Sequence, residues 1–144
     1  MRIIIQDPLP DQEEHIVIVT KTMTDKLSRV INILKSPESL TVYDGDKALI
    51  LQISSVYYVE NVDQKNFIYA EKVVYRSRLK MAELEEMLCN DDFLRVNRNT
   101  IVNVRKVRSV APAGGGKFAA ELTNGEMLII SRQFVPLLKR RFGL

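Results

Sequence analysis

Arginine, lysine and asparagine side chains in the C-terminal half of the chain offer the most evident chemistry. An Arg guanidinium can bridge O6 and N7 of guanine, an Asn amide can bridge N6 and N7 of adenine, and Lys or Arg neutralises phosphates. The alternative is a basic surface that only keeps a β-rich protein solvated. The basic side chains are Arg95, Arg98, Arg105, Lys106, Arg108, Arg132, Lys139, Arg140 and Arg141.

The distribution of charge along the chain is uneven, and it leaves both of these interpretations open. Residues 1–64 carry six Lys/Arg and ten Asp/Glu, a net charge of −4. Residues 65–144 carry fifteen Lys/Arg and eight Asp/Glu, a net charge of +7. Halves this uneven suggest a polyanionic partner for the basic half. A content of 46% hydrophobic and 27% charged residues in 144 residues excludes a disordered chain and fits one globular domain with a short appendage.

Enzyme motifs are absent from the sequence, and we predict neither an enzyme nor a cofactor. The chain has no phosphate-binding loop ending in Lys-Ser/Thr and no G-x-S-x-G elbow, and the three glycines at 114–116 lie between predicted strands. One histidine, His15, and one cysteine, Cys89, are too few for a His/Cys zinc site or an internal disulfide. We expect His15 to be structural or exposed and Cys89 to be a small buried hydrophobe.

Localisation follows from cysteine usage and from the lack of a long apolar run. A single cysteine fits a reducing cytoplasm. No apolar run approaches the roughly 18 residues that a membrane span requires, and the N-terminus lacks the apolar core and cleavage site of a signal peptide. The sequence therefore predicts a cytoplasmic protein.

The first forty residues predict a small β-β-α unit. Residues 3–5 and the run HIVIVT at 15–20 are apolar and β-branched, as in strands. Leu27, Val30, Ile31 and Leu34 then follow the period of one helix face, with Thr24 as the N-cap and Ser36-Pro37 as the stop. The acidic balance and the apolar stripe suit either packing onto the rest of the chain or pairing with a second copy.

The remaining sequence predicts mainly strands, so the fold class is mainly β (α+β) with short helices. Asp44-Gly45 and Asn124-Gly125 are hairpin signals between apolar runs. Residues 56–60 and 67–70 are further strands, separated by a polar loop at 61–66, and residues 93–110 alternate for much of their length. Helical spacing marks residues 79–88 and a final helix from about Phe134, with Pro136 in its first turn.

Several of these segments together resemble a known family. The run FLRVNRNTIVNVRKV at 93–107 resembles the signature of the LytTR-type DNA-binding domain, and VYYVE at 56–60 resembles the family's strand that ends in Glu. LKMAELEEML resembles the helix before the signature, and LTNGEMLIISRQFVPLLKRRFGL resembles the closing segment with its Ser131-Arg132 pair. The resemblance covers about residues 45–144 in the family's order. It divides the chain into an N-terminal extension, 1–40, used for packing or dimerisation, and a LytTR-like DNA-binding domain, 41–144.

The resemblance implies a sequence-specific transcriptional regulator of a bacterial cytoplasm, similar to small members that lack a receiver domain. Such an elongated β domain sends loops into successive major grooves of double-stranded DNA, and its direct-repeat targets recruit two copies. It also implies control by a membrane-protein regulator, and no small-molecule ligand is evident. The resemblance assigns DNA contacts to Lys65, Asn66, Asn97, Arg98 and Arg132.

Three asparagines within the signature run need separate treatment. The family usually has His or Ser where this chain has Asn97, and Ser where it has Asn99, so the donor set that reads the target differs. The resemblance makes Asn103 a buried structural residue that caps neighbouring backbone and not a DNA contact.

An RNA- or protein-binding adaptor that uses the same basic β face is the alternative to a DNA-binding regulator. Single-stranded RNA recognition needs exposed aromatic rings on which bases can stack. Tyr57, Tyr58, Phe67 and Tyr69 lie in apolar strands, where most of them are expected in the core. A salt-dependent preference for duplex over single strand separates the two readings.

Overall fold

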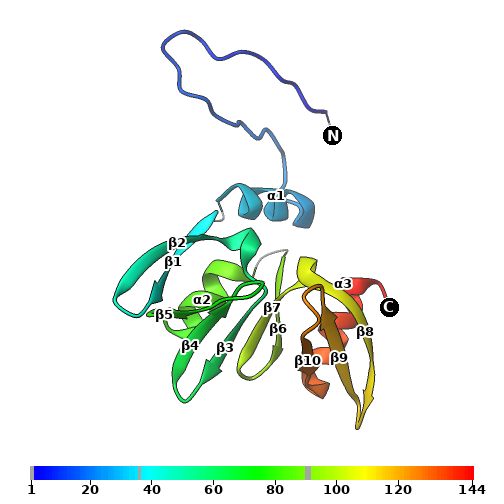
Figure 1. Ribbon diagram of the computed structural model, residues 1–144. Coiled ribbons are helices and arrows are strands. Elements are labelled where there is room, and N and C mark those ends of the chain that lie inside the picture. The colour runs from blue at the N-terminus through cyan, green and yellow to red at the C-terminus, as the bar shows by residue number, and fades with distance from the viewer. Residues whose placement is uncertain (1, 36, 90–91) are drawn as a thin grey trace.

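A seven-stranded antiparallel sheet forms the larger part of the computed structural model, which describes residues 2–35, 37–89 and 92–144 (Figure 1). The order of its strands is β2-β1-β5-β4-β3-β7-β6. Each hydrogen-bonded pair of neighbours in this sheet is antiparallel. The strands are β1 (Ser39–Asp44), β2 (Lys47–Gln52), β3 (Tyr58–Val62), β4 (Lys65–Tyr69), β5 (Val74–Ser77), β6 (Phe93–Asn97) and β7 (Thr100–Asn103).

A second, three-stranded sheet and short helices complete the fold. Its order is β10-β9-β8, from β8 (Val107–Gly114), β9 (Lys117–Leu122) and β10 (Met127–Ile130). The α-helices are α1 (Asp25–Lys35), α2 (Met81–Leu88) and α3 (Val135–Phe142), and the 3-10 turns are η1 (Ile53–Ser55), η2 (Val104–Lys106) and η3 (Arg132–Phe134). Among the described residues, no helix combines the length and apolar character needed to cross a bilayer. The mainly β fold class predicted from the sequence is confirmed.

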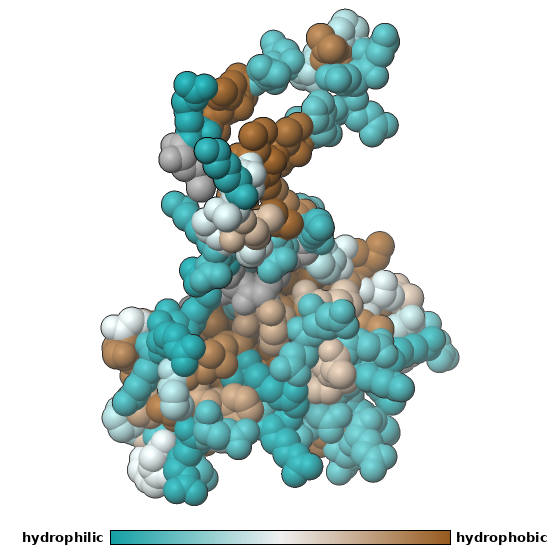
Figure 2. Space-filling model, turned by 180° about the vertical axis from the view of Figure 1, so that it is seen from behind, coloured by the Kyte–Doolittle hydropathy of each residue, from teal (hydrophilic) through white to brown (hydrophobic). Residues whose placement is uncertain are grey.

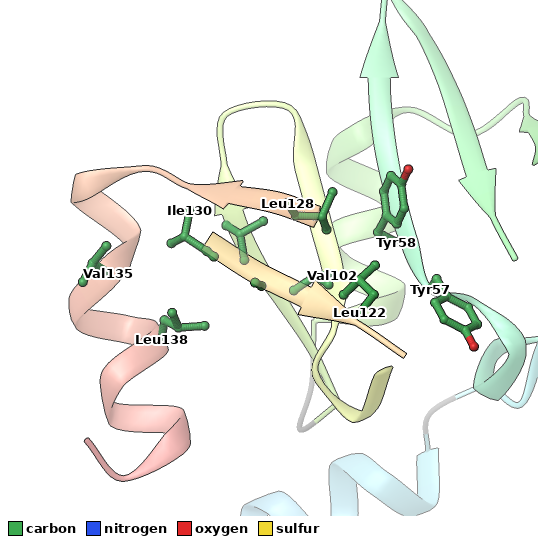
Figure 3. Close-up of a cluster of buried hydrophobic side chains, with 10 residues drawn as sticks. Tyr57, Tyr58, Val102, Leu122, Leu128, Ile130, Val135 and Leu138 are labelled. Atoms are coloured by element: carbon green, nitrogen blue, oxygen red, sulfur yellow. The ribbon is translucent and has the colours of Figure 1, made fainter. Parts of the chain in front are cut away.

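Two apolar clusters hold these layers together. One packs α2 against the large sheet, with Leu84 and Leu88 of the helix fully buried beside Ile68 and Ile101 of the strands. The other lies between the two sheets and α3, and Figure 3 shows side chains of α3, β10, β9 and β7 gathered there with Tyr57 and Tyr58. Burying each large aliphatic side chain contributes about 1.5–3 kcal/mol, so the two clusters fix the relative position of the sheets.

Tyrosines on the large sheet contact the turn between β9 and β10 at one end of the second cluster. The rings of Tyr58 on β3 and Tyr69 on β4 stack with centroids 4.1 Å apart. Burial and a hydrogen bond to Glu126, in the turn before β10, raise the pKa of Tyr58 far above its usual range. Thr123 donates a hydrogen bond of 3.1 Å to the Tyr57 hydroxyl across the same junction. The aromatic rings of these strands are therefore core residues, as expected from their apolar surroundings.

The hairpin signals and the first helix agree with the sequence predictions. Asp44 pairs with Lys47 across a two-residue turn in which Gly45 has a φ of +61°, a conformation that glycine adopts at little cost. Gly125 likewise has a positive φ between β9 and β10. The Thr24 side chain accepts a hydrogen bond of 3.2 Å from the Leu27 amide, as an N-cap does. Helix α1 ends at Lys35, and Ser36 lies outside the described residues.

Two predicted strands are wrong. Residues 3–5 and 15–20 form no strand in the structure and lie exposed in the extension before α1 (Figure 1). β-branched residues favour extended backbone, but a strand also needs a neighbour to pair its amides and carbonyls, and no segment among the described residues pairs with these two. The stripe of α1 is also not buried, since no α1 residue is.

The polar segment at 61–66 is a tight hairpin instead of the predicted loop. Val62 pairs with Lys65, which leaves Asp63 and Gln64 as a two-residue turn. Both have a positive φ, +50° and +64°, as a type I′ turn requires. The alternating run at 93–110 is likewise divided, because a turn at Arg98-Asn99 and the 3-10 turn η2 separate β6, β7 and β8.

Candidate nucleic-acid interface

Three hairpin turns and the segment after β10 lie along one edge of the molecule. In Figure 1 the β3–β4, β6–β7 and β8–β9 turns and the end of β10 all lie at the lower edge, opposite α1. The antiparallel order of the strands brings these connections to one side of the molecule. They are distant in the sequence, since 66 residues lie between Lys65 on the first turn and Arg132 after β10. The side chains on these turns are therefore the candidates for a shared binding surface.

The β3–β4 turn presents Lys65 and keeps Asn66 inside. Lys65 is exposed at the first position of β4, whereas Asn66 is only 6% exposed. The Asn66 amide nitrogen donates to the Leu79 carbonyl at 2.9 Å, and its side-chain oxygen accepts from Asn61 Nδ2 at 2.7 Å. A base contact by Asn66 would require these hydrogen bonds to be given up, so in this structure Asn66 holds the hairpin on which Lys65 stands.

The β6–β7 turn presents Arg98 on a backbone held by side chains. The Asn97 side-chain oxygen accepts a hydrogen bond of 2.9 Å from the Asn99 amide, and its nitrogen donates to the Ile129 carbonyl at 3.2 Å. Arg95 donates to the carbonyl oxygens of Asn97 and Arg98. The Arg98 side chain itself is exposed at the tip. Asn97 is half-buried, and its two hydrogen bonds hold the turn from which the arginine extends.

Arg132 leaves the chain where β10 ends, beside the β8–β9 turn. The Ser131 amide donates to the Val96 carbonyl at 2.9 Å, which fixes the start of η3 against β6. The Arg132 side chain lies flat over Gly116. A Cβ added at Gly116 would be 2.8 Å from Arg132 Cδ and 3.0 Å from Cγ. Glycine is therefore required at this turn both for its φ of +76° and for the room it leaves to the arginine.

Lys117 is the functional candidate that sequence reasoning missed. It begins β9 directly after Gly116, and with Ser131, Arg132 and Gln133 it lines an open depression on the surface. Two cations, a hydroxyl and an amide on one shallow wall form a surface that suits a phosphate or a base edge. No spacing in the sequence links Lys117 to Arg132, because the turn and the strand order bring them together.

Four exposed cations lie on these turns and on the segment after β10, and we call them the cationic edge: Lys65, Arg98, Arg132 and Lys117. Each step along it is joined by an observed contact. The Asn61 amide donates to the Asn99 carbonyl at 2.8 Å between the first two turns. The Asn97 side chain donates to the Ile129 carbonyl between the β6–β7 turn and the end of β10. At the last step, Lys117 and Arg132 line the same depression.

Other basic side chains of the C-terminal half are engaged within the protein. Lys106 lies 5.1 Å from the ring centre of Tyr57, and Lys139 lies 5.4 Å from that of Phe118. Ion pairs among the described residues join Arg95 to Glu85, Arg105 to Asp92 at 2.8 Å and Arg108 to Glu121 at 3.3 Å. Of the basic residues that the sequence presents as one set, Arg95, Arg105, Lys106, Arg108 and Lys139 therefore have partners within the protein, Arg98 and Arg132 belong to the cationic edge, and Arg140 and Arg141 are exposed on α3.

Asn103 has the structural role predicted for it. It is buried, donates from Nδ2 to the Val56 carbonyl at 2.8 Å, and accepts from the Arg105 amide at 3.1 Å. Cys89 is partly buried beside α2, and burial raises the pKa of its thiol to about 12. Among the described residues, no group of three or more His, Cys, Asp or Glu side chains could hold a metal ion.

Comparison with known proteins points to DNA. The family model of the LytTr DNA-binding domain matches residues 46–143, which is more than half of the chain. A solved structure described as the LytTr DNA-binding domain of a putative methyl-accepting/DNA response regulator from Bacillus cereus superposes with a TM-score of 0.71. It is 26% identical and covers 76% of this chain and 100% of that one.

Two curated relatives are regulatory proteins of greater length. Sensory transduction protein LytT of Enterococcus faecalis is 23% identical over 140 residues, which is 94% of this chain and 58% of LytT. Transcriptional regulatory protein YpdB of Escherichia coli K12 is 21% identical over 80 residues, 56% of this chain and 33% of YpdB. This chain thus spans little more than half of the first relative and a third of the second. From the match over residues 46–143 and the shared fold, the chain belongs to the LytTr DNA-binding domain family.

Proposed function

We propose that this chain is a sequence-specific DNA-binding transcriptional regulator that applies its cationic edge to double-stranded DNA. The observation that carries the proposal is the set of four exposed cations, contributed by three turns and the end of β10 and linked by contacts at each step. Turns projecting from a rigid sheet suit groove recognition because their side chains extend beyond the backbone of the sheet. The names of the relatives LytT and YpdB support a regulatory role.

The five predicted contact residues take two kinds of role in this proposal. Arg98 and Arg132 read base edges, since a guanidinium can bond O6 and N7 of guanine, and Lys65 adds a contact at the first turn. Lys117 joins them as a phosphate contact. Asn66 and Asn97 belong to the interface through the turns they shape, which is supported by the hydrogen bonds that occupy their amides.

The resemblance extends the proposal to the arrangement on DNA. We propose that two copies occupy direct repeats, each reading successive major grooves of one face of the duplex. The division into an N-terminal extension, 1–40, and a DNA-binding domain, 41–144, is part of the same proposal, as is the bacterial cytoplasm as its location. Control by a membrane-protein partner stays a prediction from the family resemblance.

The burial of the aromatic rings distinguishes duplex DNA from single-stranded RNA as the expected ligand. Tyr57 and Tyr58 are buried, and Phe67 and Tyr69 are half-buried in the sheet. Stacking of unpaired bases needs accessible ring faces, so these four rings offer little platform for single-stranded RNA. This favours duplex DNA over single-stranded RNA.

Selection from a random duplex pool tests the proposal without knowledge of the natural site. We expect repeated rounds with the full chain to enrich a short motif, and fluorescence anisotropy to show salt-dependent binding to it in preference to a scrambled duplex. Arg98→Ala and Arg132→Ala should each cost about 1–3 kcal/mol and relax base preference at one position. Lys72→Ala, which removes an exposed cation from another turn, is the matched control. Failure to enrich any motif, or equal binding to single-stranded RNA, would contradict the proposal.

A further inference from the structure

The extension before α1 exposes an apolar segment that has strand character and no neighbour. Ile16, Val17 and Val19 are 68%, 71% and 92% exposed. Among the described residues, no backbone hydrogen bond joins residues 15–20 to another segment. Figure 1 shows the extension standing away from the sheets, and Figure 2 shows hydrophobic side chains gathered along it. β-branched residues with unpaired amides and carbonyls are a template for pairing with another strand.

Helix α1 adds a second uncovered apolar surface next to this segment. Its stripe, Leu27, Val30, Ile31 and Leu34, lies on one helix face, yet none of the four is buried. An eleven-residue helix is marginal in water unless an apolar face is packed. Two adjacent apolar surfaces in one short unit therefore require a partner that offers both a strand edge and an apolar face.

We propose that this partner is a second copy of the chain, joined through an antiparallel ribbon of residues 13–21 centred on Val17. A two-fold axis through such a ribbon requires paired residues to point to the same face, so a residue at the centre lies opposite itself. With Val17 at the centre, Ile16 lies opposite Ile18, and Glu13 lies opposite Lys21 at both ends. The segment is thus complementary to itself in both shape and charge.

Charge selects this arrangement over the alternatives. A parallel pair in register would set Glu13 against Glu13 and Lys21 against Lys21, and like charges directly opposite each other are destabilising. Centring the antiparallel pair on Ile18 would set Lys21 against His15 and lose both Glu-Lys pairs. Centring on Ile16 would pair Asp11 with Lys21, but Asp11 lies in the turn at 10–11, outside the extended run. Centring on Val17 pairs opposite charges at each end within the extended run itself.

The same register explains the apolar stripe of α1. It places Ile16 and Ile18 of both copies on one face of the ribbon, as a patch of isoleucine side chains. The α1 helix of each copy follows its strand after a short connection and can lay its stripe on this patch. The dimer thereby pairs the backbone of residues 13–21 and covers the α1 stripe and the Ile16/Ile18 face, while Val17 and Val19 lie on the opposite face of the ribbon. Its use at paired DNA sites rests on the proposed function.

Sedimentation equilibrium of the full chain without DNA tests the dimer itself. We expect a reversible dimer in the micromolar range. Val17→Asp should raise its dissociation constant more than about a hundredfold, because two carboxylates would face each other at the centre of the ribbon. The far-UV circular dichroism of the sheets should not change, since Val17 contacts neither cluster. A monomeric wild type, or a Val17→Asp variant that dimerises like the wild type, would overturn the inference.

Charge reversal tests the register. Glu13→Lys and Lys21→Glu should each weaken the dimer about tenfold, since each variant puts like charges opposite at both ends. The double variant should recover to within about threefold of the wild type. Glu14→Lys, the same charge change one position along and opposite Thr20, is the matched control and should have little effect. Failure of the double variant to recover, or equal loss with Glu14→Lys, would refute the Val17-centred ribbon.

The outcomes also separate this inference from the proposed function. The edge strand β2 exposes Ile50 and offers residues 15–20 an acceptor within the same chain. Amide exchange protection of residues 15–20 in a protein that sediments as a monomer would identify that intramolecular pairing and overturn the dimer. A dimer that binds no DNA refutes the regulator but not the ribbon, whereas a monomer that binds one DNA motif refutes only the ribbon.

Discussion

Substitution of Gly116 tests whether the β8–β9 turn positions Arg132 for DNA. Gly116→Ala adds a methyl carbon that would be 2.8 Å from Arg132 Cδ and 3.0 Å from Arg132 Cγ. Those distances are too short for a carbon–carbon contact, so the arginine side chain must leave its place over the turn. Gly115→Ala is a close control, because Gly115 also has a positive φ, +62°, yet no heavy atom lies within 4 Å of its added Cβ.

The expected magnitude follows from comparing these two variants. Each alanine adopts a left-handed conformation that costs about 1–2 kcal/mol, so both variants should lose similar stability to urea. An Arg-base contact contributes about 1–3 kcal/mol of discrimination, and a displaced but flexible side chain keeps part of it. We therefore expect Gly116→Ala to weaken binding to the selected site about three- to tenfold, and Gly115→Ala to leave it nearly unchanged.

Fluorescence anisotropy on the selected and scrambled duplexes is the assay. A double variant, Gly116→Ala/Arg132→Ala, should bind no more weakly than Arg132→Ala alone, because the glycine acts through the arginine. Equal weakening by Gly115→Ala and Gly116→Ala would show that the turn, and not the position of Arg132, matters. Full additivity in the double variant would refute the reasoning in the same way.

Three further predictions concern the turns and the core. Asn103→Ala should lower the free energy of unfolding by about 2–3 kcal/mol in urea, because it leaves the Val56 carbonyl and the Arg105 amide unpaired; a loss below about 0.5 kcal/mol would contradict that role. Asp63→Asn keeps a residue type that tolerates the φ of +50° and removes an anion next to the cationic edge, so DNA affinity should rise about two- to threefold; unchanged anisotropy curves would place that turn away from DNA. Because its pKa is raised to about 12, the Cys89 thiol should react slowly with iodoacetamide in the folded protein at pH 8–9 and rapidly in urea, where the pKa returns to about 9; equal rates would mean the thiol is exposed.

Local signals predicted the elements that depend only on nearby residues. Gly45 and Gly125 mark hairpins because glycine takes up the positive φ that such turns need. The turn at Asp63 and Gln64 also has a positive φ at both positions, but it contains no glycine to mark it, so the sequence predicted a loop. That difference moved Lys65 and Asn66 from a loop into β4 and placed Asn66 inside.

Features that depend on distant segments could not be predicted in the same way. Residues 15–20 have strand-like composition, but whether they form a strand depends on a neighbour that composition does not reveal. Arg98 and Arg132 were predicted through the family resemblance, and the structure brings their turns to one edge. Lys117 was missed because its place beside Arg132 comes from the fold of β8 and β9 and from the space at Gly116.

The salt dependence of DNA binding tests the role of the cationic edge most directly. The measurement compares the Lys65→Gln/Lys117→Gln variant with the wild type, and uses Lys35→Gln/Lys72→Gln as the control with two exposed lysines removed elsewhere. If Lys65 and Lys117 each neutralise a phosphate, the slope of log K against log salt should become shallower by about 1.8, and the control should keep the wild-type slope. An unchanged slope in the edge variant, or an equal change in the control, would contradict the assignment of this edge to DNA.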